Sequence, residues 1–353
     1  MVSAKRPARP VHPAALALGL GLAALPVAAA ADPVADFYRG KTVTLIVGFD
    51  AGGGYDTAAR ILIRHWGRHI PGNPTVIVSN MAGAGSMVAL NYVYNAAVKD
   101  GTAMGMFSAP IVLEPLLGNT KAQFDAARFG YVGNIHTDIN SCGVSKATGI
   151  KTFGELLASN KQVVFGAISP ENVTSRYPVF FKKVFNAPLK IVNGYKGTNA
   201  IILAMQKGEA DATCGMYESS LLGPFRSSFE SGDMKIVFQT AFEKKIGTFG
   251  DATSIGEFIA GKGDEMRQLA EMVFRPTEIT RPIVAPPGVP PERLAALKAA
   301  FNAAMADPLL LADGKRISID FLPMTGERVF QIISGFLKTP PAVVRKAQEA
   351  SVE

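Results

Sequence analysis

The most constraining feature of this chain is an apolar, strand-like segment that runs into three consecutive glycines and then into a helical pattern. Residues 41–49, KTVTLIVGF, are β-branched or apolar almost throughout, which is typical of a parallel strand covered on both faces. After the glycines, apolar residues recur every three or four positions from Ala59 to Ile70. This periodicity predicts a helix that begins at Asp56.

The same succession returns along the chain. A strand at 75–80 precedes a second glycine loop, MAGAGS, which is followed by a helix N-capped by Ser86 and by a strand at 100–108. This alternation predicts an α/β fold with a parallel sheet and right-handed crossovers. Further strands are expected at 131–135, 142–145, 163–167, 189–195 and 210–216, helices at 151–160, 197–209 and 291–308, and a loop at 281–290.

The first residues have the pattern of an export signal. Basic residues precede an apolar run at 14–30, and the small residues Ala29 and Ala31 suit a signal peptidase. The run contains a proline and is shorter than the roughly 20 apolar residues that a membrane span needs. We therefore expect a cleaved signal peptide at 1–31 and a periplasmic location, with a membrane anchor as the alternative.

Charge and cysteine content narrow the function classes. The net charge is +7 at pH 7, but no block rich in Lys and Arg is present, so no nucleic-acid binding is expected. The mild positive charge favours anionic ligands. Cys142 and Cys214 both lie in strand-like segments, and the sequence leaves open whether they form a disulfide or remain buried thiols.

The glycine loops lack the features of nucleotide-binding loops. Neither has the lysine of a phosphate-binding P-loop or the third spaced glycine of a dinucleotide motif. Unpaired amides at a helix N-terminus still attract anions, and both loops follow strands at the same end of one sheet. Together they could hold one carboxylate. Alternatively, the glycines only permit tight turns, and Asp56 either caps its helix or contacts ligand or water.

Enzymatic motifs are absent from the sequence. There is neither a G-x-S-x-G nor an H-E-x-x-H segment, and His65 and His69 have the spacing of metal ligands but no evident third ligand. We interpret these histidines as surface or boundary residues and expect no catalysis, metal or cofactor. A periplasmic hydrolase or lyase using Asp56, Glu171 or Glu218 as acid–base groups is the alternative.

Four segments carry a family resemblance. Residues 49–60, 80–108, 194–215 and 285–308 resemble, in order, the motifs of the substrate-binding proteins of tripartite tricarboxylate transporters, known as TctC-like or Bug-type receptors. The resemblance implies a periplasmic binding protein type II fold, in which two α/β domains enclose a ligand cleft. Domain 1 would comprise residues 32–135 plus 242–353, and domain 2 residues 136–241.

The resemblance also implies a set of ligand-binding positions. They are Gly53, Gly54 and Asp56 in the first loop, Ala84 and Gly85 in the second, Ser108 after the third strand, Lys196 and Gly197 in a later turn, and, as approximate counterparts, Ser169, Asn172, Thr174 and Glu218. Glu171 and Glu218 weaken the case for citrate-like substrates. They leave room for a monocarboxylate, an aromatic acid or an amino acid, unless both point to water.

The function implied by the resemblance is capture without chemistry. We expect a monomeric receptor that closes on a small organic carboxylate and delivers it to one small and one large membrane permease subunit. A sensory partner that presents its ligand to a membrane kinase would use the same fold and is a second alternative.

Overall fold

The computed structural model describes residues 1–4, 8, 32–317 and 321–351. The chain divides into two units, residues 1–32 and 33–353, and every described helix and strand belongs to the second unit. The predicted signal peptide at 1–31 lies almost entirely outside the described residues and stays a prediction.

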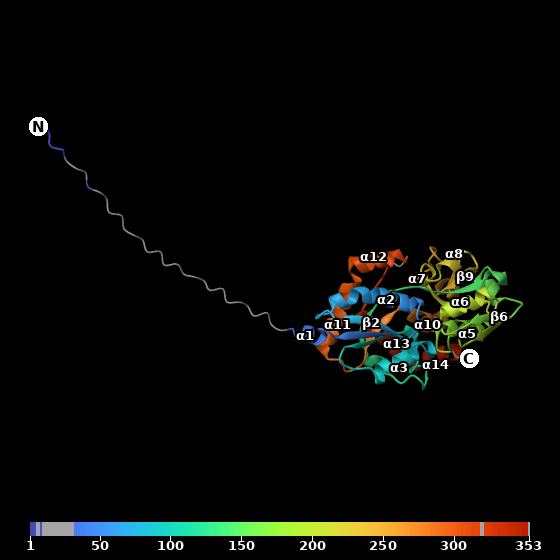
Figure 1. Ribbon diagram of the computed structural model, residues 1–353. Coiled ribbons are helices and arrows are strands. Elements are labelled where there is room, and N and C mark those ends of the chain that lie inside the picture. The colour runs from blue at the N-terminus through green and yellow to red at the C-terminus, as the bar shows by residue number, and fades with distance from the viewer. Residues whose placement is uncertain (5–7, 9–31, 318–320, 352–353) are drawn as a thin grey trace. The chain divides into compact units, whose positions relative to one another are not determined.

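The described part of the chain forms two six-stranded sheets, each of which is the centre of one lobe (Figure 1). The order of the first sheet is β12-β4-β11-β3-β1-β2, and that of the second is β10-β9-β5-β8-β6-β7. The first sheet contains β1 (Thr42–Val47), β2 (Thr75–Asn80), β3 (Ala103–Met106), β4 (Gly130–Asn134), β11 (Pro282–Ala285) and β12 (Met324–Thr325). The second contains β5 (Asn140–Ser145), β6 (Val163–Gly166), β7 (Leu189–Val192), β8 (Ala212–Tyr217), β9 (Met234–Gln239) and β10 (Thr253–Ser254).

Helices cover both sheets. With the first sheet lie α1 (Pro33–Tyr38), α2 (Gly54–Trp66), α3 (Met87–Asn95), α11 (Pro291–Met305), α12 (Pro308–Arg316) and α13 (Gly326–Leu337). With the second lie α4 (Phe153–Leu157), α5 (Val173–Phe185), α6 (Thr198–Gln206), α7 (Glu218–Leu221), α8 (Arg226–Glu230), α9 (Ile255–Ile259), α10 (Gly263–Phe274) and α14 (Pro341–Ser351). None of the described helices could by itself span a membrane by length and apolar content, and α11 with α12 pass that test only as a pair bent by 58°.

The strand assignments confirm the α/β prediction and correct one part of it. β1 runs parallel to β2 and β3, and β6 runs parallel to β7. However, the predicted loop at 281–290 contains β11, which pairs antiparallel with both β3 and β4. Flanking prolines concealed this strand in the sequence. Pro282 is its first residue, a position at which proline is tolerated in a sheet.

Within the described ranges the chain passes between the two lobes at three places, near 135–139, 275–281 and 338–340. The last passage brings α14 against α5 and α10 of the second lobe, as Figure 1 also shows. β10 pairs with β9, so residues 253–254 belong to the second sheet. The expected return to domain 1 at residue 242 therefore comes too early, because a second-sheet strand lies beyond it.

A disulfide joins Cys142 of β5 to Cys214 of β8. The two strands are antiparallel neighbours in the second sheet, and both sulfurs are fully buried. Of the two states that the sequence left open, the structure has the bridged one.

Candidate functional site

A cavity of about 230 Å³ lies between the lobes, at the ends of β1, β3 and β8. Its walls combine first-lobe residues that follow β1 with second-lobe residues at the starts of α5 and α6. The lining residues are Phe49, Asp50, Ala51, Gly53, Gly54, Tyr55, Ser108, Ile168, Asn172, Val173, Thr174, Lys196, Gly197, Thr198, Asn199, Ala200, Gly215, Tyr217, Ser220 and Phe225. This position between two lobes is the usual one for a small-molecule site.

Three helix N-termini meet at this cavity. The N-cap residues of α2 and α6 are Gly53 and Gly197, which have no side chain with which to cap the first amides. At the start of α5, the Asn172 side chain accepts a hydrogen bond of 3.0 Å from the Thr174 amide. The positive ends of the α2 and α6 dipoles therefore face the cavity with unsatisfied N–H groups, an arrangement that favours an anion.

The three glycines of the first loop differ in backbone conformation and in the space that a side chain would find. Gly52 has a φ of +84°, which strongly favours glycine. Gly53 lines the cavity, and a Cβ there would make only an ordinary van der Waals contact, 3.7 Å from the Asp50 carbonyl oxygen. A Cβ on Gly54 would lie only 2.5 Å from the Ser220 Oγ of the other lobe. The loop thus needs glycine at position 52 for its turn and at position 54 for close approach of the lobes, whereas a side chain at position 53 is sterically tolerated.

Asp56 organises the loop and is not among the described residues that line the cavity. One of its carboxylate oxygens accepts hydrogen bonds from the Gly52 amide at 2.9 Å and from Arg60 at 2.8 Å, and the other accepts one from Asn80 at 2.9 Å. Burial raises its pKa, but these hydrogen bonds outweigh that effect and hold the pKa below its usual value. α2 also begins at Gly54 and not at Asp56. Asp56 therefore ties the glycine loop to α2 and β2.

The second glycine loop packs against the opposite lobe. A Cβ on Gly85 would lie 3.0 Å from the Asn172 side chain and 3.2 Å from the Ser169 Oγ. Ser86 does not cap α3 with its side chain; its Oγ accepts the Ser108 amide at 3.0 Å. Ala84, Gly85 and Ser169 are thus outside the described cavity lining, whereas Ser108 lies within it.

Of the predicted second-lobe residues, some line the cavity and others do not. Asn172, Thr174, Lys196 and Gly197 line the cavity, and the Thr174 Oγ1 accepts the Ile168 amide at 2.9 Å. Glu218 instead lines a separate hollow, where its carboxylate accepts a hydrogen bond of 2.6 Å from Thr248.

Glu171 is likewise outside the described cavity lining. Its negative charge acts on Glu114, whose pKa is raised mainly by burial and further by repulsion from Glu171. The two acidic residues that were expected to discriminate between ligands therefore do not belong to the described wall of the cavity.

Aromatic residues form part of the wall that the sequence did not identify. Phe49 stacks on Tyr55 with ring centroids 4.2 Å apart, and Tyr55 meets Tyr217 edge-on at 6.4 Å. Phe225 adds a further ring to the lining. Burial raises the pKa of the Tyr55 and Tyr217 hydroxyls, and neither hydroxyl meets hydrogen-bond geometry with another described residue. Aromatic residues are common in cores, so only the fold distinguishes these from packing residues.

Arg281, which precedes β11, connects the site to the passages between the lobes. Its side chain is 1% exposed. The guanidinium donates to the Gly54 carbonyl at 3.2 Å and to the Ser219 Oγ at 2.8 Å, and lies 3.7 Å from the Asp138 carboxylate. The first glycine loop, the second lobe and the interlobe passage near 135–139 therefore all contact this buried guanidinium. A lone arginine gives no sequence signal for this role.

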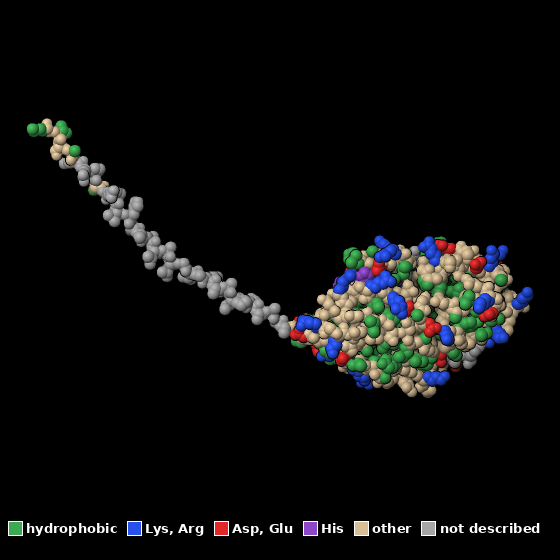
Figure 2. All heavy atoms as spheres, viewed as in Figure 1, with side chains coloured by type: hydrophobic (Ala, Val, Ile, Leu, Met, Phe, Trp, Pro, Cys, Tyr) green, Lys and Arg blue, Asp and Glu red, His purple; other side chains and the backbone are tan. Residues whose placement is uncertain are grey.

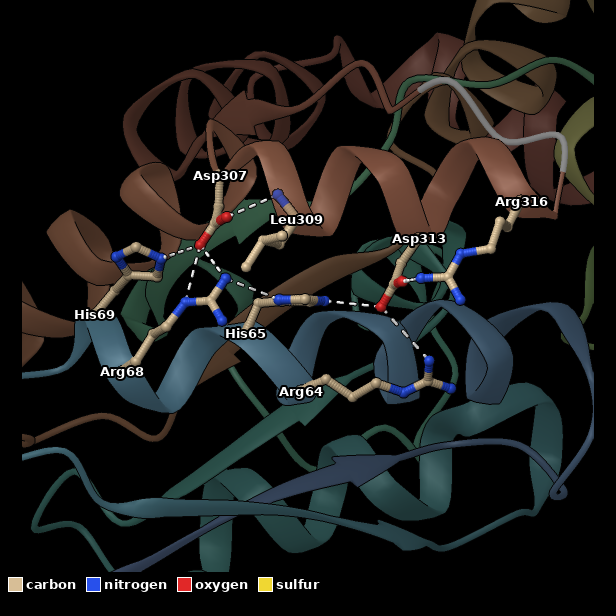
Figure 3. Close-up of polar contacts among 8 residues, drawn as sticks. All are labelled: Arg64, His65, Arg68, His69, Asp307, Leu309, Asp313 and Arg316. Carbon is tan, nitrogen blue, oxygen red and sulfur yellow. Dashed lines mark hydrogen bonds and ion pairs between the residues drawn. The ribbon is translucent and has the colours of Figure 1, made fainter.

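The two predicted boundary histidines belong to a separate cluster in which the end of α2 and the turn at Gly67–His69 face α12 and its N-cap (Figure 3). The Arg68 guanidinium donates to His65 Nδ1 at 2.9 Å, so His65 Nε2 carries a proton and donates to Asp313 at 2.8 Å. His69 Nε2 is 2.8 Å from Asp307, which also accepts from Arg68. In Figure 2 the histidine atoms that are visible lie next to both Lys or Arg and acidic side chains. The spacing of the histidines thus matches two separate carboxylates, that of the α12 N-cap residue Asp307 and that of Asp313 within α12.

Comparison with known proteins supports the fold. No family model matches the chain. It is 24% identical over 339 residues, 94% of each chain, to the UPF0065 protein in gbd 5'region of Cupriavidus necator. The solved periplasmic binding protein BugD is similar with a TM-score of 0.72 and 19% identity, over 90% of this chain and 99% of BugD.

Two solved structures from Rhodopseudomonas palustris contain ligands. MatC with bound malate has a TM-score of 0.65 and 18% identity, over 86% of this chain and 99% of MatC. A protein solved with adipate has a TM-score of 0.68 and 16% identity, over 88% of this chain and 97% of that one. These likenesses confirm the predicted fold, two α/β lobes of a periplasmic binding protein, and its resemblance to Bug-type structures.

Proposed function

We propose that this chain, which has the fold of Bug-type periplasmic binding proteins, is a receptor that captures a small organic carboxylate between its lobes. The observation that carries the proposal is the meeting of two uncapped helix N-termini and Lys196 at one interlobe cavity. Such termini stabilise an anion through amide hydrogen bonds and the helix dipole. Malate and adipate, bound by two proteins of similar fold, are also carboxylates.

Capture proceeds by closure of the lobes. Contacts between the lobes exist only when the lobes are together, as with Gly54 against Ser220 and the buried ion pair between Glu114 and Arg176. A carboxylate that bridges the two sides adds to these contacts, so it shifts the equilibrium toward the closed state. The closed receptor then presents its ligand to a membrane permease pair on the periplasmic side. This delivery step and the location are part of the proposal.

Binding without chemistry fits the placement of the acidic residues better than a hydrolase or lyase does. Asp56 is engaged by three hydrogen-bond donors, and Glu171 and Glu218 are outside the described cavity lining. None of the three groups that could have acted as acid and base is therefore among the described residues that line the cavity.

The test replaces a glycine that lines the cavity and tolerates a side chain sterically. Gly53→Val adds a side chain at an extended backbone position with a φ of −78°, so the fold should remain while carboxylate binding is lost. Gly335→Val, at an exposed position of α13, is the control and should bind as the parent does. Calorimetry against a panel of mono-, di- and tricarboxylates supplies the measurement. Unchanged affinity in a folded Gly53→Val protein would remove the cavity from the proposal.

A further inference from the structure

The charges around the cavity match a single negative charge on the ligand. Among the described lining residues, the acidic Asp50 and the basic Lys196 offset each other. The remaining positive potential comes from the uncapped N-termini of α2 and α6. Each terminus is equivalent to roughly half an elementary charge, so the two together match about one carboxylate.

These two helix N-termini lie at the same end of the cavity. A Cβ on Gly52 would lie 3.8 Å from the Asn199 side chain, so the loop before α2 touches the first turn of α6. Ala51, Lys196 and Asn199 are all exposed, which places this end toward solvent. A carboxylate bound here would be shared by both helices.

Among the described residues, the buried part of the lining contains rings, aliphatic side chains and the uncharged polar residues Ser108, Asn172, Thr174 and Ser220, but no charged side chain. Tyr55, Tyr217 and Phe225 are at least 91% buried, and Val173 lies beside them in the lining. The tyrosine hydroxyls are neutral at neutral pH, and burial raises their pKa further. The Arg281 guanidinium lies 5.7 and 5.6 Å from the centroids of Tyr55 and Tyr217 and 3.7 Å from the Asp138 carboxylate, but it is not part of the described lining. A second carboxylate placed here would be desolvated without a partner cation, which is costly.

From these observations, and resting on the proposed function, we propose that the ligand is a monocarboxylate whose remainder is an uncharged ring. The carboxylate binds the two helix N-termini at the solvent-facing end, and the ring lies among Tyr55, Tyr217 and Phe225. The volume is suitable, since an apolar cavity of about 150 Å³ accepts benzene, and the 230 Å³ found here leaves room for a carboxylate as well.

The experiment compares probes that differ in one group. Benzoate and cyclohexanecarboxylate are the ring monoacids, 1,4-benzenedicarboxylate and adipate are the diacids, and benzamide lacks the charge. We expect both ring monoacids to bind at least about ten-fold more tightly than either diacid, because the diacids bury an unpaired charge. Benzamide should not bind. Calorimetry with the folded protein gives the affinities.

A pair of phenylalanine variants tests the ring contact. Phe225→Leu keeps an apolar side chain but removes a lining ring, so the preference for benzoate over adipate should shrink several-fold. Phe229→Leu, at a partly buried phenylalanine of α8 outside the described lining, should leave the preference unchanged. Melting temperatures establish that both variants are folded.

The outcomes separate the two proposals. Tighter binding of either diacid than of the ring monoacids would overturn the ligand class and leave the carboxylate receptor standing. Benzamide binding as tightly as benzoate, or no binding of any acid, would overturn the receptor function itself. An equal shift of preference in both phenylalanine variants would overturn the placement of the ring.

Discussion

At the scale of single residues, the site depends on groups that hold the loop in position as much as on groups that face the ligand. Asp56 illustrates this, because its two carboxylate oxygens accept hydrogen bonds from Gly52, Arg60 and Asn80, which lie in three different segments. The sequence left its role open between helix capping and ligand contact. It could not decide, because Asn80 lies on β2 and only the folded sheet brings it to Asp56.

Replacing Asp56 with asparagine should destabilise the protein at neutral pH. The variant would place an amide N–H₂ group against the donors Arg60 or Asn80, and losing a charged hydrogen bond costs about 1.5–3 kcal/mol. Because the folded-state pKa of Asp56 is lowered, its stabilisation is present above pH about 4 and is lost as the pH falls through the folded pKa. Urea unfolding at pH 7 and pH 3 measures both effects.

The matched control is Asp36→Asn, whose exposed ion pair with Arg39 should contribute less than about 1 kcal/mol. A free energy of unfolding that is the same in Asp56→Asn and in the parent at pH 7 would contradict the role assigned to this carboxylate.

At the scale of elements, prediction from the sequence succeeded where apolar runs are bounded by glycine loops. β2 occupies the expected residues 75–80, and β1 lies within the expected 41–49. It failed for β11, which is four residues long and bounded by prolines. So short a strand is defined by its neighbours β3 and β4 more than by its own composition.

The disulfide between β5 and β8 should contribute strongly to the stability of the second lobe. It closes a sequence separation of 72 residues, for which chain-entropy arguments give a stabilisation of about 4 kcal/mol. Reduction should therefore lower the melting temperature markedly. Calorimetric scans with and without a phosphine reductant check this, and Cys142 and Cys214 are the only cysteines, so no other bridge interferes. Identical melting temperatures would show that the bridge contributes little.

At the scale of the whole molecule, the closed state depends on contacts far apart in the sequence. The Glu114–Arg176 pair joins the segment after β3 to α5 of the other lobe, and both side chains are at least 91% buried. Neither residue belongs to a motif. This explains why the sequence predicted the two lobes and part of the cavity lining but not the interactions that hold the lobes together.

Replacing Arg176 with methionine should weaken carboxylate binding without removing any residue of the described cavity lining. The substitution leaves Glu114 without its partner cation, which destabilises the closed state. Burial raises the folded-state pKa of Glu114, so the carboxyl is tolerated at low pH and becomes unfavourable as the pH rises through that pKa. The loss of affinity, measured by calorimetry, should therefore be larger at pH 8 than at pH 5.

Arg226→Met is the control for this variant, because Arg226 and its ion-pair partner Glu230 are both 55% exposed. Exposed pairs contribute little, so its affinity should stay close to that of the parent. A loss of affinity in Arg176→Met that does not change between pH 5 and pH 8 would contradict the role given to Glu114.

The position of β11 has a consequence for the order in which this molecule can form. β11 lies between β3 and β4, yet it is synthesised only after the entire second sheet. Until Pro282–Ala285 are available, β3 and β4 each present an unpaired edge in the first lobe. β3 and β4, which are synthesised early, can therefore complete their pairing only after β11 has been synthesised. A nascent chain that ends before β11 would still expose these strand edges to chaperones and proteases.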